Sequence, residues 1–339
     1  MRRDVTELGR SVSLLLAALA AWSMPCSGAS ASPYQPLALE ATIPLEKVSG
    51  RIDHMAIDLG RKRLLVAELG NNSVDVVDLA AMKPIHRIDG LHEPQGVAFA
   101  PTADLILIAS GGDGSVKMFS GTDFSEAGQI DLGTDADNIR LDPGTGQAIV
   151  GYGRGGLAFI DPAKRSKTAE IELPGHPEGF QLAPGRGQIF VNIPDIREIA
   201  VVDPIAGKQV ATWKDSELRS NFPMAVDGSL QLLASVYRNP AQLVVYDPAT
   251  GKATAKLGAC DDADDVFVDA KLQRIYVSCG EGVIDVFQRL PSGFALMTKV
   301  ATRAGARTSL FVPELDRLFL AVRASGSQPA AIWVFRPQL

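Results

Sequence analysis

A short pattern of polar and apolar residues recurs along the chain. Each copy is a pair of residues, most of them polar, followed by alternating apolar positions, as in Asp53-His54-Met55-Ala56-Ile57 and Gln95-Gly96-Val97-Ala98-Phe99. The second residue of the pair falls at positions 54, 96, 138, 179, 223, 265 and 308, at intervals of 42, 42, 41, 44, 42 and 43 residues. Such regular spacing predicts one structural unit repeated seven times.

Each unit contains three further runs with the alternation of a β-strand. In the first unit the second and third strands are predicted at Arg63–Ala67 and Val74–Asp78, and a weaker fourth strand is visible in other units, as at Thr168–Leu173. Turn residues separate the runs, and no stretch has helical periodicity over ten or more residues. Four short strands in about 42 residues, repeated seven times, predict an all-β fold: a seven-bladed β-propeller of four-stranded antiparallel blades.

The two ends of the chain predict how the ring closes. The seventh unit ends soon after its third strand, Ala331–Phe335, and therefore lacks a fourth. Near the N-terminus, apolar residues alternate over residues 37–45 and form a spare strand. We expect this strand to complete the last blade and to cover its open edge.

Three segments resemble the repeats of a known family. Tyr276-Val277-Ser278-Cys279 and Phe190-Val191-Asn192 are similar to the second strand of YncE-like (YVTN repeat) propellers, and residues 72–78 are similar to the third strand. The resemblance covers residues 37–339. It implies an exported propeller that acts in binding or as a scaffold, and it implies no particular reaction.

The first 31 residues have the features of a secretory signal peptide. Arg2 and Arg3 precede the short apolar run Ser11–Trp22, and small residues follow it. We therefore expect cleavage near residue 31, a single mature domain over residues 32–339, and a periplasmic or secreted location. Cys26 raises the alternative of a lipoprotein anchor, but Pro25 does not fit the small-residue context of such an anchor.

Composition excludes several classes of partner. The 339 residues include 33 Lys and Arg against 39 Asp and Glu, and this acidic balance argues against nucleic-acid binding. No internal apolar run is long enough to cross a membrane. The sequence also lacks haem-attachment and nucleotide-binding motifs. We expect a monomer whose partner is a small molecule or another exported protein.

The recurring pairs are the candidate functional residues. The first strand of each propeller blade lines the central channel, so the pairs should form a ring around one mouth of that channel. Oxygen ligands from several strands suit Ca²⁺ or Mg²⁺, and a nearby histidine would also allow Zn²⁺ or Mn²⁺. The candidate metal ligands are Asp137, Glu178, Asp264 and Asp265. An alternative is that these carboxylates only solvate the mouth.

Further members of the ring are candidates for binding a ligand. They are His54, Gln95, Asn138, Asn221 and Arg307, joined by Arg238 and Arg323 from neighbouring loops. The three arginines would bind a carboxylate or phosphate, or else form ion pairs between blades. His54 is expected to be the only histidine in the ring, and with Asp53 it is the candidate for acid–base catalysis.

Two functions follow from these residues. The first is binding of a small anionic ligand or a partner protein at the mouth. The second is a metal-dependent hydrolase of lactones or esters, because Glu178, Asn138 and Asp264 occupy places comparable to the Glu, Asn and Asp that hold a divalent ion in the gluconolactonase family. That likeness is one of fold and ligand type, since the flanking motifs differ.

Cys260 and Cys279 are the only cysteines that remain after removal of the signal peptide. Both are predicted near the top of the sixth blade, and an oxidising compartment would permit a disulfide between them. The alternative is two separate buried thiols.

Overall fold

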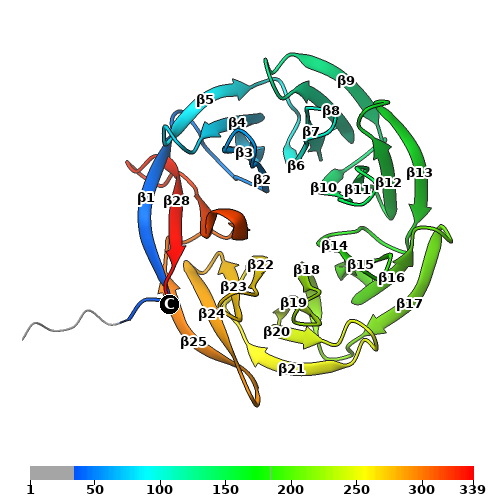
Figure 1. Ribbon diagram of the computed structural model, residues 1–339, viewed down its shortest axis with the longest axis vertical. Coiled ribbons are helices and arrows are strands. Elements are labelled where there is room, and N and C mark those ends of the chain that lie inside the picture. The colour runs from blue at the N-terminus through cyan, green and yellow to red at the C-terminus, as the bar shows by residue number, and fades with distance from the viewer. Residues whose placement is uncertain (1–33, 184) are drawn as a thin grey trace, which may run out of the picture. The chain divides into compact units, whose positions relative to one another are not determined.

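The computed structural model describes residues 34–183 and 185–339, which contain 28 β-strands. The strands form seven four-stranded antiparallel sheets, or blades, arranged in a ring (Figure 1). The predicted seven-bladed propeller is confirmed. The predicted signal peptide lies outside the described residues.

The first four blades follow the chain without interruption. Blade 1 contains β2 (Met55–Asp58), β3 (Arg63–Glu68), β4 (Ser73–Asp78) and β5 (Lys83–Ile88). Blade 2 contains β6 (Pro94–Ala100), β7 (Leu105–Ser110), β8 (Ser115–Ser120) and β9 (Glu126–Asp131). Blade 3 contains β10 (Ala136–Leu141), β11 (Ala148–Tyr152), β12 (Gly156–Asp161) and β13 (Ser166–Glu172). Blade 4 contains β14 (Phe180–Ala183), β15 (Gln188–Ile193), β16 (Glu198–Asp203) and β17 (Lys208–Lys214).

The last three blades complete the ring. Blade 5 contains β18 (Arg219–Asp227), β19 (Leu232–Asn239), β20 (Ala241–Tyr246) and β21 (Ala253–Gly258). Blade 6 contains β22 (Ala263–Asp269), β23 (Arg274–Cys279), β24 (Val283–Leu290) and β25 (Gly293–Ala301). Blade 7 contains β26 (Ser309–Val312), β27 (Arg317–Val322), β28 (Ala330–Pro337) and, as its outermost strand, β1 (Leu37–Leu45).

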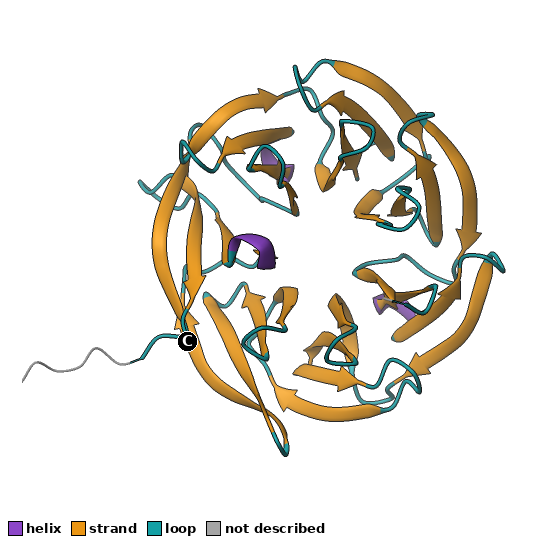
Figure 2. Cartoon of the chain, in the orientation of Figure 1, coloured by secondary structure: helices purple, strands orange, loops and turns teal. Residues whose placement is uncertain are grey.

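Helical structure in the described part of the chain is limited to three 3₁₀ turns, η1 (Leu69–Asn71), η2 (Pro194–Ile196) and η3 (Pro313–Leu315) (Figure 2). No helix there is long and apolar enough to span a membrane.

The second and third strands of each blade form the core. Residues on β3 and β4 are almost all buried, whereas β5 and β17 are largely exposed. Apolar side chains pack between neighbouring blades, as where Tyr276 of blade 6 contacts Phe311 of blade 7 edge-on. This burial explains why the sequence signal is strong for second and third strands and weak for fourth strands.

The N-terminal strand closes the ring. β1 pairs antiparallel with β28, and Ile43 and Leu45 lie opposite Ile332 and Ala330. The predicted closure between the two ends of the chain is therefore confirmed, and the two strands lie side by side in Figure 1.

Candidate functional site

The first strands of several blades begin with an irregular residue pairing. The register with the second strand shifts between Ala136 and Ile139 in blade 3, between Asn221 and Met224 in blade 5, and between Ala263 and Asp265 in blade 6. Such bulges change the direction of side chains. As a result, the consecutive residues Asp137 and Asn138 both line the channel mouth, although neighbours on a regular strand point to opposite faces.

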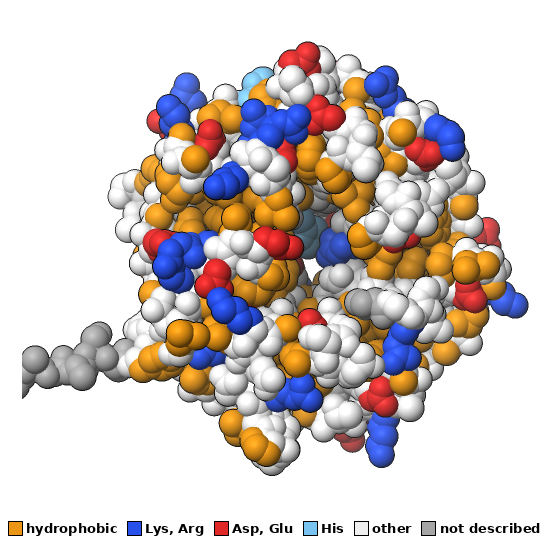
Figure 3. All heavy atoms as spheres, viewed as in Figure 1, with side chains coloured by type: hydrophobic (Ala, Val, Ile, Leu, Met, Phe, Trp, Pro, Cys, Tyr) orange, Lys and Arg blue, Asp and Glu red, His pale blue; other side chains and the backbone are white. Residues whose placement is uncertain are grey.

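The mouth contains a polar cavity of about 300 Å³. All the predicted ring residues except Asn221 and Arg323 line it, together with Arg51, Arg140 and His176, which were not predicted. The prediction that His54 would be the only histidine in the ring is therefore wrong. Figure 3 shows the hollow at the centre of the ring, with basic and histidine side chains visible inside it.

One side of the cavity, from blades 3 and 4, carries two carboxylates and an imidazole. Candidate ligand atoms of Asp137, His176 and Glu178 all lie within 4.8 Å of one another. His176 Nε2 is 3.7 Å from Asp137 Oδ2, and its Nδ1 hydrogen-bonds to the carbonyl oxygen of Gly153. Of the four predicted metal ligands, Asp137 and Glu178 are thus brought together, with His176 as a third partner.

Burial and neighbouring charges shift the pKa of both Glu178 and His176. Burial, followed by the negative charge of Asp137, raises the pKa of Glu178 to about 7. Burial alone would lower the pKa of His176, but the contacts with Asp137 and the Gly153 carbonyl raise it to about 9. Carboxylates that lie close together repel one another when both are ionised. Such a group therefore favours a bound cation or a bound proton.

The other side of the cavity, from blades 5 to 7, is dominated by arginines paired with carboxylates. Arg238 and Arg307 both form ion pairs with Asp264 and with Asp262. Arg238 also stacks on the Phe222 ring, with its guanidinium carbon 3.9 Å from the ring centroid. Burial would raise the pKa of Asp264, but the two guanidinium groups hold it below its ordinary value. Asp264 therefore lies with arginines, apart from the Asp137 group.

Arg140 is placed differently from these paired arginines. It lies on β10 at the inner end of the cavity, where it also lines a second cavity of about 400 Å³ further along the channel. Its guanidinium donates to the carbonyl oxygen of Ile139 and has no carboxylate within 4.0 Å among residues 34–183 and 185–339. Arg140 is half-buried, and burial lowers its pKa although the negative charges of Asp265 and Asp137 oppose that shift.

His54 lies between two buried carboxylates. Its Nε2 is 3.7 Å from Asp53 Oδ1 and its Nδ1 is 4.0 Å from Asp265 Oδ1. Burial would lower the pKa of His54, but these carboxylates raise it. Asp53 also pairs with Arg51, and Asp265 accepts a hydrogen bond from the Ser309 backbone N–H at 2.7 Å. Neither contact of His54 is a hydrogen bond at these distances.

Two predicted ligand-binding residues lie outside the cavity lining. Asn221 is fully buried and donates hydrogen bonds to Asn192 Oδ1 and to the carbonyl oxygen of Glu198, so it links blades 4 and 5. Arg323 is partly exposed, and burial together with the nearby Arg307 and Arg51 lowers its pKa. His176 was not predicted as a site residue, although it lies two residues before Glu178. In an extended segment, residues two apart point to the same side, so this spacing could have indicated that the two side chains lie together.

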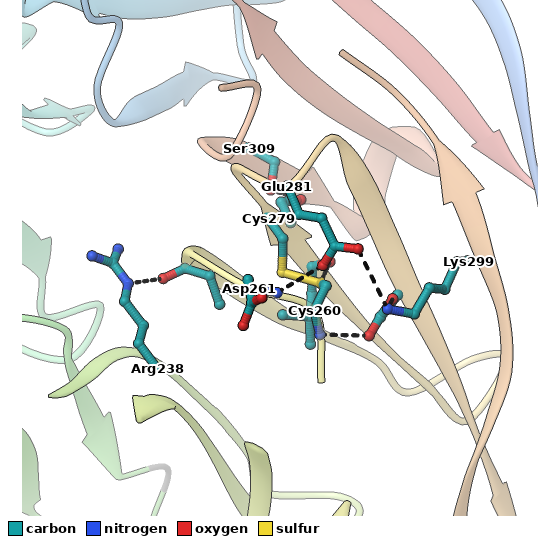
Figure 4. Close-up of a disulfide and its surroundings, with 11 residues drawn as sticks. Arg238, Cys260, Asp261, Cys279, Glu281, Lys299 and Ser309 are labelled. Atoms are coloured by element: carbon teal, nitrogen blue, oxygen red, sulfur yellow. Dashed lines mark hydrogen bonds and ion pairs between the residues drawn. A yellow bond between two sulfur atoms is a disulfide. The ribbon is translucent and has the colours of Figure 1, made fainter. Parts of the chain in front are cut away.

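Cys260 and Cys279 are joined by a disulfide (Figure 4), with their Cα atoms 5.9 Å apart. The bond links the loop before β22 to the end of β23. The Cys260 N–H donates to Asp285 Oδ2, and the next N–H, of Asp261, donates to Glu281 Oε2. These contacts fix the loop that carries Asp262 and leads into β22, where Asp264 lines the mouth.

We predict that Cys260 and Cys279 cannot be alkylated when the purified protein is denatured without reductant. Closing a loop of this length contributes on the order of 3 kcal/mol by restricting the unfolded chain, so reduction should lower the melting temperature. Mass spectrometry after alkylation tests the bond. A Cys260→Ser/Cys279→Ser variant is the control for the melting measurement, because it shows any effect of the reductant that does not come from this disulfide. Two alkylated cysteines in the parent would contradict it.

Comparisons with known proteins establish the fold and no family. No protein-family model and no curated protein matches the chain. Among solved structures, Kuenenia stuttgartiensis hydrazine synthase is similar over 84% of this chain and 94% of its own, with a TM-score of 0.74 and 16% identity. A chain from the crystal structure of a mitotic checkpoint complex is similar over 97% of this chain and 98% of its own, with a TM-score of 0.76 and 12% identity. At such low identity these neighbours support the propeller fold alone.

Proposed function

We propose that this protein is an exported, YncE-like propeller that binds a small anionic molecule in the channel mouth. The YVTN-like strands and the signal-like N-terminus support the family and the location. β-Propellers commonly bind ligands or partners at such a mouth. A cavity of about 300 Å³ suits a small molecule better than a protein segment.

The observation that carries the proposal is the unpaired guanidinium of Arg140 inside the channel. A half-buried cation with no carboxylate within 4.0 Å in the described part of the chain attracts anions, and a carboxylate or phosphate that accepts its remaining N–H groups would form charge-assisted hydrogen bonds with it. Arg238 and Arg307 are already neutralised by Asp262 and Asp264, so they would shape the opposite wall of the cavity.

We expect inorganic phosphate or succinate to bind once per chain in metal-free buffer, and Arg140→Gln to weaken that binding at least about tenfold. Loss of one charge-assisted hydrogen bond accounts for a change of this size. Isothermal titration calorimetry measures it. Arg165→Gln is the matched control, because Arg165 is exposed on the outside of the ring. Equal affinity of the parent and Arg140→Gln, or no binding of either anion, would contradict the proposal.

A metal-dependent hydrolase of the lactone or ester type is the second candidate, favoured by the group of Asp137, His176 and Glu178. Its ligand set would differ from the Glu, Asn and Asp of gluconolactonases, since Asp264 is engaged by Arg238 and Arg307. Turnover of a simple lactone that depends on an added divalent ion and on Glu178 would favour this candidate over a binding protein.

A further inference from the structure

We propose that Asp137, His176 and Glu178 bind one divalent transition-metal ion of the Zn²⁺ or Mn²⁺ class at the channel mouth, with the amide oxygen of Asn138 as a fourth ligand. This inference does not depend on anion binding at Arg140. One imidazole nitrogen with two carboxylates is a common ligand set for these ions, whereas Ca²⁺ and Mg²⁺ prefer oxygen ligands alone.

The orientation of His176 is the first argument. Metal-binding histidines usually donate their second ring N–H to a backbone carbonyl or a carboxylate, which fixes the ring and leaves the other nitrogen for the metal. Here Nδ1 contacts the carbonyl oxygen of Gly153, so Nε2 is the nitrogen that faces Asp137. The 3.7 Å between Nε2 and Asp137 Oδ2 is too long for a hydrogen bond and leaves space for an ion between them.

Asn138 is the second, independent argument. Its side chain is 2% exposed and lines the cavity, yet its Oδ1 accepts no hydrogen bond. A buried amide oxygen without a donor costs on the order of 1–3 kcal/mol, and coordination of a cation would satisfy it. Asn138 follows Asp137 directly, at the bulge where both residues line the mouth.

The backbone around the three ligands is held firmly. Glu178 N–H donates to the carbonyl oxygen of Asn192, and Asn192 N–H donates to that of Gly179. Pro177, between the two ligands from blade 4, lies against Gly151 of blade 3 so closely that a Cβ there would be 3.1 Å from Pro177 Cγ. Preformed positions of this kind favour a metal site, because little conformational freedom is lost on binding.

The alternative is a His176 imidazolium that pairs with Asp137 without any metal. In that case both ring nitrogens carry protons and no ion is needed. Direct titration distinguishes the two, since a proton-bridged pair has no saturable metal affinity.

The test is calorimetric titration of the chelator-stripped full chain with ZnCl₂ and MnCl₂, with CaCl₂ and MgCl₂ for comparison. We expect one Zn²⁺ or Mn²⁺ per chain, affinity at least about tenfold higher than for Ca²⁺ or Mg²⁺, and a further loss of at least about tenfold in His176→Gln and Glu178→Gln. His86→Gln is the control, because it removes one exposed imidazole from the outer strand β5. Thermal melts establish that each variant is folded.

No saturable binding by the parent would overturn the proposal, as would unchanged affinity in both site variants. If either variant fails to fold, anomalous scattering from crystals of the parent soaked in Zn²⁺ takes its place. An anomalous peak between Asp137, His176 and Glu178 would support the site. Zinc bound only at other positions would overturn the proposal. Failure here would leave phosphate or succinate binding at Arg140 unaffected, because that binding is measured without metal.

Discussion

Deleting residues 32–46 is expected to lower the melting temperature by more than about 10 °C. The deletion removes β1, in which Leu37, Ile43 and Leu45 are fully buried, and each such side chain contributes roughly 1.5–3 kcal/mol. It also exposes the pairing edge of β28 and removes the ion pairs that Glu40 forms with Arg317 and Arg336. For a domain of this size, each kcal/mol lost from the free energy of unfolding lowers the melting temperature by roughly 2–4 °C.

The matched control is deletion of residues 32–35, which leaves β1 intact. Differential scanning calorimetry measures both truncated chains beside the parent. If the longer deletion melts within about 2 °C of the shorter one, the closing strand does not hold the ring together.

The second large effect is a dependence of stability on pH that comes from Asp265. Burial is the main cause that raises the pKa of this carboxyl from 3.8 to about 7, and the nearby Asp264 adds to it. The folded state therefore binds a proton that the unfolded state releases, and the stability gained from this proton is lost as pH rises from about 4 through 7. At pH 8 the shift in the pKa of Asp265 lowers the free energy of unfolding by roughly 2–4 kcal/mol.

We expect Asp265→Asn to be more stable than the parent at pH 8, by roughly 2–4 kcal/mol, and equal to it near pH 3, where Asp265 is protonated in both the folded and the unfolded state. At pH 5 we expect an intermediate difference. An asparagine at this position keeps an oxygen for the Ser309 N–H and carries no charge. Urea unfolding at these pH values measures the difference, with Asp89→Asn, on the exposed outer surface, as the control. A variant that is less stable than the parent at pH 8 would contradict the prediction.

The strands could be predicted because each blade repeats the same alternation under the same burial. The second strand at Ala148–Tyr152 agrees with the sequence-based range, and β1 was recognisable because the seventh unit lacked its fourth strand. The fourth strands were less distinct, since β5 and β17 bury few side chains.

The mouth was only partly predictable, because its contacts form between blades. The sequence shows the polar pairs but not the bulges that turn Asp137 and Asn138 toward the same cavity. Alternation alone could not reveal that Asp264 would pair with two arginines while Asp137 would meet His176. Arg140 was not predicted as a site residue. It alternates with apolar residues along its strand, and the sequence pattern does not distinguish it from an ordinary strand residue.

We propose that the channel mouth is the binding site of this protein. A crystal structure of the parent equilibrated with succinate, at a concentration that saturates binding in solution, tests it most directly. We expect electron density for one anion in the mouth cavity, with a carboxylate within hydrogen-bond distance of the Arg140 guanidinium. Succinate bound only on the outer surface of the ring, with water alone in the cavity, would contradict it.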